Sequence, residues 1–291
     1  TLTRHAGIAL NELRHRGHGR FLVFDPSMRD AARERMRLAS LLTGRSQKTR
    51  FMVHYQPILA ATDARVIGAE ALLRFATEDG EVLHTSEMVE AAEANGLIGE
   101  IGSWVLRDAM RAHKRAEDSL SGCRLNVNVS PIQVQDGHIG EDVRLALEET
   151  GFSPQNLTVE ITENVLLDNE PDTVRFLQEL RTQGVKIVID DFGTGYSSLS
   201  YLRKLPIDGL KIDRSFVMSM ERDPDAEAVV GSIIALADSL GLETTAEGVE
   251  TEGQRGRLKR LGVDYVQGFL FGEAMPVEDF SAYLGANKPL T

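Results

Sequence analysis

The sequence predicts an α/β protein built as a TIM-like (β/α)8 barrel with an antiparallel first strand, and three observations support this class. From residue 51 onward, short apolar runs alternate with longer amphipathic stretches, and the number of repeats favours a barrel over an open doubly wound sheet. A turn near residues 62–64 separates the first two apolar runs as in a hairpin, which indicates that the first strand runs antiparallel to the others. Glycines stand where helices should end, as expected for left-handed caps, and these are Gly151, Gly184, Gly241 and Gly262.

The expected elements follow one another in alternating order. We expect strands over residues 52–59, 66–75, 124–130, 157–163, 186–192, 209–213, 243–248 and 265–270. We expect helices near residues 86–95, 98–117, 140–150, 171–183, 196–204, 225–240, 252–261 and 277–284. The pattern is clear over residues 225–240, where apolar residues recur at the spacing of one helix face.

Residues 1–50 form a leader that differs from the rest of the chain. We expect a short helix near 4–15, a strand over Phe21–Phe24 and a basic helix near 27–43, which is too little chain for an independent core. The leader is interpreted as a linker with the remnant of an upstream domain, and residues 51–291 as the barrel domain. The chain begins at Thr1 rather than Met, as expected for a piece of a longer protein.

The charge of the chain is unevenly distributed. Residues 1–50 carry 11 Lys and Arg against 4 Asp and Glu, a net charge of +7, and residues 51–291 carry 21 against 40, a net charge of −19. Such an acidic body disfavours bulk nucleic-acid binding, because contacts to phosphates need clustered cations. A small anionic substrate would need bound cations to approach it.

Other classes of protein are excluded by simple counts. Cys123 is the single cysteine, so no internal disulfide can form and a cysteine-based zinc site is not expected. No apolar run reaches the roughly 20 residues that span a bilayer. We therefore expect a cytoplasmic domain, while the full-length protein could be anchored in a membrane further upstream.

Polar residues interrupt the apolar strands close to their C-terminal ends, where barrel enzymes carry their active sites. These residues are Glu70, Asn126, Asn128, Glu160, Glu163, Asp190, Asp191, Lys211, Asp213, Glu247 and Glu250. A buried carboxylate is costly unless it is paired, hydrogen-bonded or bound to a cation. Metal-dependent catalysis and structural ion pairing both account for the pattern.

The chemistry of this set favours hard cations. Carboxylate and amide oxygens suit Mg²⁺ or Mn²⁺, and the adjacent Asp190 and Asp191 could serve two ions of the kind used for phosphoester hydrolysis. The following segment 191–198 contains Gly193 and Gly195, which permit unusual backbone angles near a ligand. An ordinary βα turn is the alternative interpretation of that segment.

Taken together, these motifs resemble the EAL-domain family of cyclic di-GMP phosphodiesterases. The resemblance covers about residues 51–285 and rests on the runs 55–57 (YQP), 70–74 (EALLR), 126–130 (NVNVS), 160–163 (EITE), 190–195 (DDFGTG), 210–213 (LKID), 246–250 (AEGVE) and 267–269 (QGF). It implies hydrolysis of one phosphodiester of cyclic di-GMP to linear pGpG with two Mg²⁺ or Mn²⁺ ions. The family fold, a barrel with an antiparallel first strand, agrees with the prediction above.

The resemblance also implies a role for each matching residue. Glu70, Asn128, Glu160 and Asp190 would hold one ion. Asp190, Asp191 and Glu247 would serve the second. Lys211 would orient the attacking water, and Glu163 would brace the loop after Asp191. The residues implied to contact the substrate are Gln56, Leu73, Arg74, Asp213 and Gln267. The residues implied to support the site are Glu250, Gly193, Thr194 and Gly195.

The chain departs from the family pattern in two places. Thr85 and Met88 replace a common Pro and Phe, and Glu273-Ala274 replaces a common Lys-Pro. Residues 1–45 resemble the last helix and strand of a GGDEF domain, the diguanylate cyclase module, but lack its motif, so no cyclase activity is expected. The implied partners are cyclic di-GMP, a second copy bound through barrel helices, and upstream sensory or GGDEF domains.

Two other functions remain open at this point. A catalytically weak receptor or interaction module for cyclic di-GMP would bind without hydrolysis, although this chain keeps the motif residues. An unrelated metal-dependent barrel lyase would use Lys211 as a base.

Overall fold

The computed structural model describes residues 5–6, 23–43, 49–116, 120, 122–166, 170–195 and 202–286. The chain divides into two compact units. One comprises Thr1–Met52 and Arg74–Leu97, and the other comprises Val53–Leu73 and Ile98–Thr291. The predicted boundary near residue 50 between a leader and a barrel domain stays a prediction.

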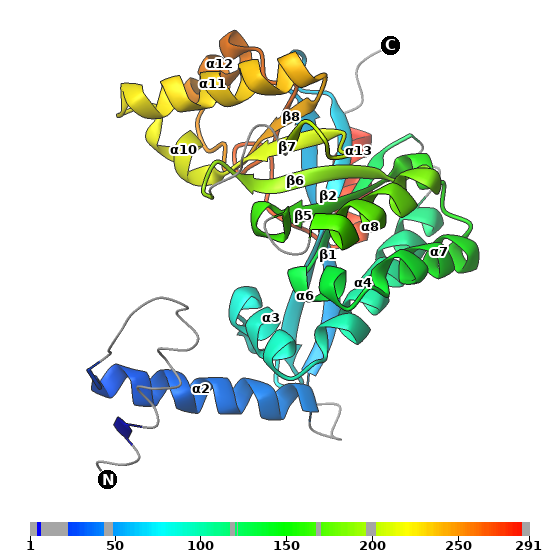
Figure 1. The fold of residues 1–291 in the computed structure, drawn as a ribbon, viewed down its shortest axis with the longest axis vertical. Coiled ribbons are helices and arrows are strands. Elements are labelled where there is room, and N and C mark those ends of the chain that lie inside the picture. The colour runs from blue at the N-terminus through cyan, green and yellow to red at the C-terminus, as the bar shows by residue number, and fades with distance from the viewer. Residues whose placement is uncertain are drawn as a thin grey trace. The chain divides into compact units, whose positions relative to one another are not determined.

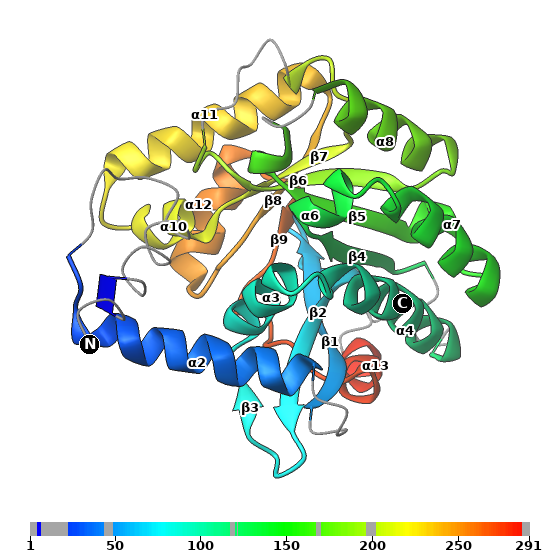
Figure 2. The same ribbon diagram turned by 60° about the horizontal axis from the view of Figure 1, so that its bottom comes forward.

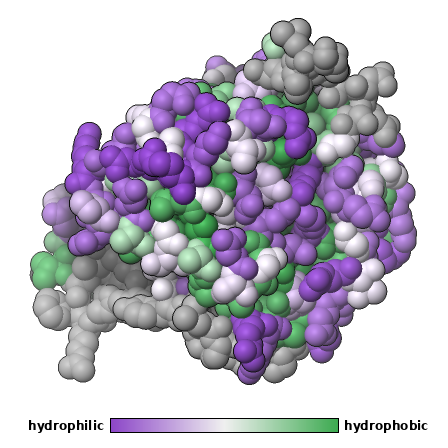
Figure 3. Space-filling model, turned by 90° about the horizontal axis from the view of Figure 1, so that it is seen from above, coloured by the Kyte–Doolittle hydropathy of each residue, from purple (hydrophilic) through white to green (hydrophobic). Residues whose placement is uncertain are grey.

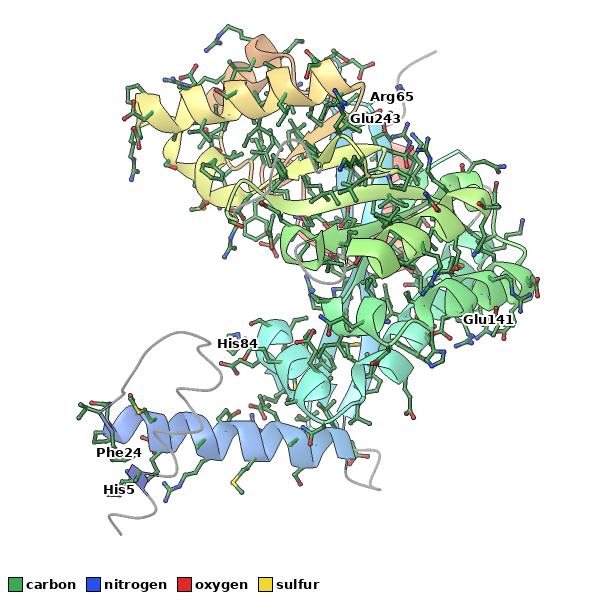
Figure 4. All side chains as sticks on the ribbon, in the orientation of Figure 1. His5, Phe24, Arg65, His84, Glu141 and Glu243 are labelled. Carbon is green, nitrogen blue, oxygen red and sulfur yellow. The ribbon has the colours of Figure 1, made fainter. Side chains whose placement is uncertain are left out.

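The smaller unit contains helix α2 (Pro26–Thr43), the hairpin end of β2 (Val66–Thr77) with β3 (Val82–Leu83), and helix α3 (Thr85–Ala94). Helix α2 packs against α3, and the buried residues of α2 include Met28 and Leu38. The predicted basic helix near 27–43 is therefore confirmed. Of the predicted strand Phe21–Phe24, the structure describes only residues 23–24, and these are not in a strand. The ring of Phe24 instead stacks on His5, with 4.1 Å between the ring centroids (Figure 4). Most of the predicted helix 4–15 lies outside the described residues.

The larger unit is the predicted barrel. Its remaining strands are β1 (Thr49–Ala60), β4 (Arg124–Val129), β5 (Leu157–Thr162), β6 (Lys186–Phe192), β7 (Gly209–Ile212), β8 (Glu243–Ala246) and β9 (Tyr265–Val266). Among the described residues the strand order is β1-β9-β8-β7-β6-β5-β4-β2-β3, and pairing of β1 with β2 closes the barrel. β1 pairs antiparallel with β9, whereas the pairings from β2 through β4 to β9 are parallel. The class and the antiparallel first strand are confirmed.

Helices cover the outer face of the strands in this unit (Figures 1 and 2). They are α4 (Ile98–Arg115), α7 (Ile139–Thr150), α8 (Glu170–Thr182), α11 (Pro224–Leu240), α12 (Glu252–Leu261) and α13 (Val277–Ala286). Local signals set their ends: Asp223 caps the first turn of α11 by accepting from Asp225 N, and Gly241 ends it at φ 68°. The other three predicted cap glycines also have positive φ, between 63° and 90°.

Several short elements were not predicted. They are α6 (Pro131–Gln135), α10 (Arg214–Ser219) and the 3-10 turns η1 (Pro154–Asn156) and η2 (Glu163–Leu166). α6 begins at a capping box between Ser130 and Gln133, and Asp213 caps α10. Most of the predicted helix 196–204 falls on residues outside the described ranges.

Two predicted strands were too long at their C-terminal ends. β8 stops at Ala246 and β9 at Val266 because the backbone turns away at the glycines that follow. Gly248 has φ 66°, and a Cβ on Gly268 would lie 2.3 Å from the backbone of Val249. The chain therefore leaves the sheet with Glu247 and Gln267 at the rim of the barrel.

Alternation along the strands separates an apolar outer layer from a polar interior. On β4, Leu125, Val127 and Val129 are buried, and Asn126 faces the barrel interior between them. The interior is tightly filled, since the small cavity that Asn126 lines measures only about 20 Å³. Figure 4 labels Arg65, which immediately precedes β2, and Glu243, which begins β8, and both mark the N-terminal end of these strands.

The surface is mixed in character. In the space-filling view hydrophobic residues lie in small groups among hydrophilic ones (Figure 3). Within the described ranges, no helix combines the length and the apolar character needed to cross a membrane.

Candidate active site

The strands bring the predicted polar residues to one end of the barrel. Glu70 on β2 lies beside Asn126 in the register, and Asn128 on β4 lies beside Glu160 on β5. Asp190 follows on β6, Lys211 on β7, and Glu247 directly after β8. Because these side chains occupy alternate positions on parallel strands, they point into the same interior.

Lys211 is the centre of this set. Its side chain is 1% exposed, and its Nζ lies 2.6 Å from Glu247 Oε1, 2.8 Å from Glu160 Oε2, 3.2 Å from Glu70 Oε2 and 3.5 Å from Asp190 Oδ1. Burial disfavours the charge of Lys211, but the surrounding carboxylates outweigh it and raise its pKa well above the ordinary value. One ammonium therefore neutralises at most one of four carboxylates.

The carboxylates titrate differently according to their partners. Burial would raise the pKa of Glu70, but Lys211 and hydrogen bonds from Gln267 and Asn128 lower it below its ordinary value. Burial and the charges of Glu70 and Asp190 raise the pKa of Glu160 well above it. Burial is also the main cause that raises the pKa of Glu247 to about 8. The site holds more negative charge than its lysine can balance.

Asp190, Asp191 and Glu247 form a group with the geometry of a cation site. One carboxylate oxygen from each lies within 4.8 Å of the others. Asp191 has a left-handed backbone with φ 54°, rare for a residue other than glycine, and Asp190 Oδ1 accepts its N–H at 2.9 Å. Burial, with the charges of Asp190 and Asp213, raises the pKa of Asp191. The donor set of three carboxylates fits a hard divalent cation.

Glu163 holds the loop that follows Asp191. Its Oε2 accepts the backbone N–H of Gly193 at 3.0 Å and of Gly195 at 3.2 Å, and the residue is only 3% exposed. Thr194 Oγ1 donates to the carbonyl of Asp191 at 2.9 Å. Glu163 therefore holds two backbone amides of this loop, and its role in the reaction stays a prediction.

Two glutamines extend the network toward the rim. Gln267 Nε2 donates to Glu70 Oε2 at 2.7 Å and to Gln56 Oε1 at 3.0 Å, and Gln56 Nε2 donates to the carbonyl of Gly272 at 3.2 Å. Among the residues that the structure describes, Gln267 Oε1 is buried and has no hydrogen-bond partner. An acceptor left in this state is available to a ligand that donates a hydrogen bond.

The remaining predicted residues differ in exposure and in the unit to which they belong. Leu73 is half-buried where β2 leaves the larger unit, and Arg74 belongs to the smaller unit. Asp213 accepts from Ser215 N at 3.0 Å as the cap of α10. Glu250 and Glu273 are exposed.

Asn126 belongs to the polar strand pattern, but the resemblance implies no role for it. Its Nδ2 donates to Glu160 Oε1 at 2.7 Å, and the residue is 9% exposed. The signal was available, because two asparagines separated by one residue on a strand face the same side.

Comparison with known proteins places this geometry in a family. The EAL domain family model matches residues 38–274, and the chain belongs to this family. The bifunctional diguanylate cyclase/cyclic di-GMP phosphodiesterase MucR of Pseudomonas aeruginosa is 37% identical over 286 residues, which are 96% of this chain and 42% of that protein. The cyclic di-GMP phosphodiesterase NbdA of the same organism is 36% identical over 291 residues, which are 99% of this chain and 37% of that protein.

Solved structures agree with this assignment. The PaMucR phosphodiesterase in its c-di-GMP complex has a TM-score of 0.79 and 38% identity, covering 85% of this chain and 99% of that one. The EAL domain of FimX from Pseudomonas aeruginosa, at 22% identity and a TM-score of 0.72, shares the fold and covers 83% of this chain and 96% of that one. The chain spans well under half the length of the two curated relatives.

Proposed function

We propose that this chain hydrolyses cyclic di-GMP to linear pGpG with two divalent cations. The observation that supports this most directly is the crowding of Glu70, Glu160, Asp190 and Glu247 around one buried lysine at the carboxyl end of the barrel. Membership of the EAL family, and a related phosphodiesterase solved with c-di-GMP, point to the same substrate.

The residues fit the cations on chemical grounds. Glu70, Asn128, Glu160 and Asp190 would hold one ion, and Asp190, Asp191 and Glu247 the other. Asn128 donates from Nδ2 to Glu70 Oε1 at 2.6 Å, which leaves its carbonyl oxygen as the atom to ligate. Bound ions of this kind lower the pKa of a water and neutralise charge at the phosphate. They would also reverse the local field, so that an acidic body can bind a dianion.

The other residues act by holding positions and charges. Lys211 stays protonated at neutral pH, since its pKa is raised, and it can donate hydrogen bonds to a water or a phosphate oxygen beside the carboxylates. A protonated lysine is a poor general base, which argues against the barrel-lyase alternative. Glu163 keeps the loop of Gly193 and Gly195 in place beside Asp191. Gln56 and the buried Gln267, which are joined by a hydrogen bond, would contact a nucleotide base or phosphate.

The test is hydrolysis by the purified chain. With Mg²⁺ or Mn²⁺ we expect cyclic di-GMP to be converted to pGpG, and with a chelator we expect no product. Asp190→Asn and Glu70→Ala should each lower turnover by at least about a thousandfold, because each removes a cation ligand. Circular dichroism should show both variants folded.

Two results would contradict the proposal. Hydrolysis that survives in either variant would refute the assignment of the site. Binding of cyclic di-GMP without product would identify a receptor instead. The homodimer, the upstream domains and the cytoplasmic location stay predictions from the sequence.

A further inference from the structure

Within the carboxylate cluster, the contact between Asn126 and Glu160 lies toward the N-terminal end of the barrel. Asn126 lies on β4 two residues before Asn128, toward the N-terminal end of the barrel. Its amide donates to Glu160 Oε1 at 2.7 Å, while Oε2 of the same carboxylate accepts from Lys211 at 2.8 Å. The two carboxylate oxygens of Glu160 therefore have separate partners. Oε1 accepts from the amide of Asn126, and Oε2 accepts from the ammonium of Lys211.

The charged residues closer to the N-terminal end of the barrel keep Asn126 in this position. Arg124 and Lys186 both bind Glu243, at 2.8 Å and 3.2 Å, so neither can turn toward Glu160 without breaking an ion pair. The cavity between the two layers measures about 20 Å³, which leaves the amide little room to move away. Glu160 itself is 0% exposed, so no bulk water competes for its Oε1.

We propose that Asn126 is a positioning residue that restricts Glu160 to ligation through one oxygen, and that it thereby favours Mg²⁺ and Mn²⁺ over Ca²⁺. With Oε1 engaged by the amide, a cation would approach Oε2, the oxygen that accepts from Lys211 and keeps a further lone pair. Ca²⁺ takes about six to eight oxygens and accepts both oxygens of a carboxylate, whereas Mg²⁺ and Mn²⁺ suit a strict octahedral set. The inference rests on the proposed function in taking Glu160 as a cation ligand.

Calorimetric titration of the metal-free 291-residue chain with Mn²⁺ and, separately, with Ca²⁺ tests this. The variants are Asn126→Leu, which is of similar size and cannot donate, and Asn126→Ala, which removes the donor without adding volume. The control is Thr158→Val, an isosteric change at the neighbouring buried position on β5. No nucleotide is present in any titration.

We expect both Asn126 variants to weaken Mn²⁺ binding by about 10- to 100-fold, the usual effect of losing a residue that orients a ligand. Ca²⁺ binding should weaken far less, because a released Glu160 can offer both oxygens, so the ratio of Mn²⁺ to Ca²⁺ affinity should fall by about tenfold. Thr158→Val should leave that ratio unchanged.

Three results would overturn the inference. They are equal weakening for both ions, unchanged Mn²⁺ binding in a variant shown to be folded by circular dichroism, and a wild-type chain that binds neither ion. If Asn126→Leu does not fold, Asn126→Ala decides the outcome. A wild-type chain that binds Mn²⁺ selectively but leaves cyclic di-GMP intact would refute the proposed function and not this inference.

Discussion

Asp191 shows how single residues at this site depart from ordinary backbone geometry. Its φ of 54° costs a non-glycine residue about 1–2 kcal/mol, and the chain keeps it because the surrounding contacts hold the turn. Two of these contacts are the bonds from Gly193 and Gly195 to one oxygen of Glu163. The loop therefore depends on a carboxylate that need not touch the substrate.

Gly195→Ala should disturb this carboxylate. A Cβ on Gly195 would lie 2.9 Å from Glu163 Oε1 and 3.0 Å from its Cδ, too close for both groups to stay in place. We expect turnover of cyclic di-GMP to fall by about 10- to 100-fold, as when the support of a catalytic group is misplaced. Steady-state hydrolysis by the purified variant measures this.

Gly231→Ala is the matched control for that variant. Gly231 lies within α11, where a Cβ would make ordinary contact with Leu261 at 3.5 Å. Alanine in a helix interior is favoured over glycine by about 1 kcal/mol, so this variant should keep full turnover and be no less stable. Equal activity of the two variants would contradict the bracing role of Glu163.

At the scale of elements, the barrel interior is divided into layers by the strand register. The C-terminal layer carries the carboxylates around Lys211. The N-terminal layer carries Arg124 from β4, Lys186 from β6 and Glu243 from β8, with the hydroxyl of Tyr265 donating to Glu243 at 2.9 Å. This layer gives β4, β6, β8 and β9 a shared polar contact at the opposite end from the site.

Glu243→Gln should lower stability in a pH-dependent way. Burial would raise the pKa of Glu243, but Arg124, Tyr265 and Lys186 lower it below its ordinary value. A pKa that is lower in the folded state stabilises the fold above about pH 4.5, the ordinary pKa of a glutamate. This stability is lost as the pH falls through the folded-state pKa. At pH 7 we expect a loss of about 1–2 kcal/mol in the free energy of unfolding, because the pairs are partly solvated.

Urea unfolding of wild type and variant at neutral and acidic pH measures that difference. In acid, below the folded-state pKa, wild type and variant should converge. The control is Glu141→Gln, which breaks an exposed pair with Arg144 on α7 and should leave stability unchanged at either pH (Figure 4). A deficit of Glu243→Gln that persists undiminished in acid would refute the electrostatic explanation.

At the scale of the whole molecule, the barrel carries an internal charge imbalance that bound cations would relieve. The carboxylates around Lys211 come from β2, β5, β6 and the end of β8, so their repulsion acts across the barrel. Stability of the larger unit is therefore expected to depend on the cation content of one site.

Lys211→Met should reveal this dependence. Without metal, loss of this buried ammonium should cost about 3–5 kcal/mol, as is typical when one partner of a buried ion pair is removed. With saturating Mn²⁺ the deficit should shrink, because the cations then balance the carboxylates, while hydrolysis stays abolished. Urea unfolding with Mn²⁺ and with a chelator gives both values, and an equal deficit in the two conditions would contradict the prediction.

The local pattern of the sequence was sufficient to predict much of the fold. Alternation and helical spacing predicted the strands and long helices of the larger unit, and the glycines predicted where four helices end. Short elements such as α6 and α10 escaped prediction because a single turn has no periodicity, although Ser130 and Asp213 are recognisable caps. β9 was predicted too long because Gly268 turns the chain away through its close approach to Val249, a contact distant in sequence.

The candidate site, like the fold, was predicted from the sequence only in part. The residue types and their order along the chain were enough to predict the barrel, its antiparallel first strand, the family and a carboxylate-rich site at the strand ends. Which carboxylate oxygen meets Lys211, that Asn126 donates to Glu160 Oε1, and that Gly195 lies against Glu163 were decided by the tertiary structure. These contacts join strands far apart in sequence, and only the register of a closed barrel brings their side chains within a few ångströms of one another.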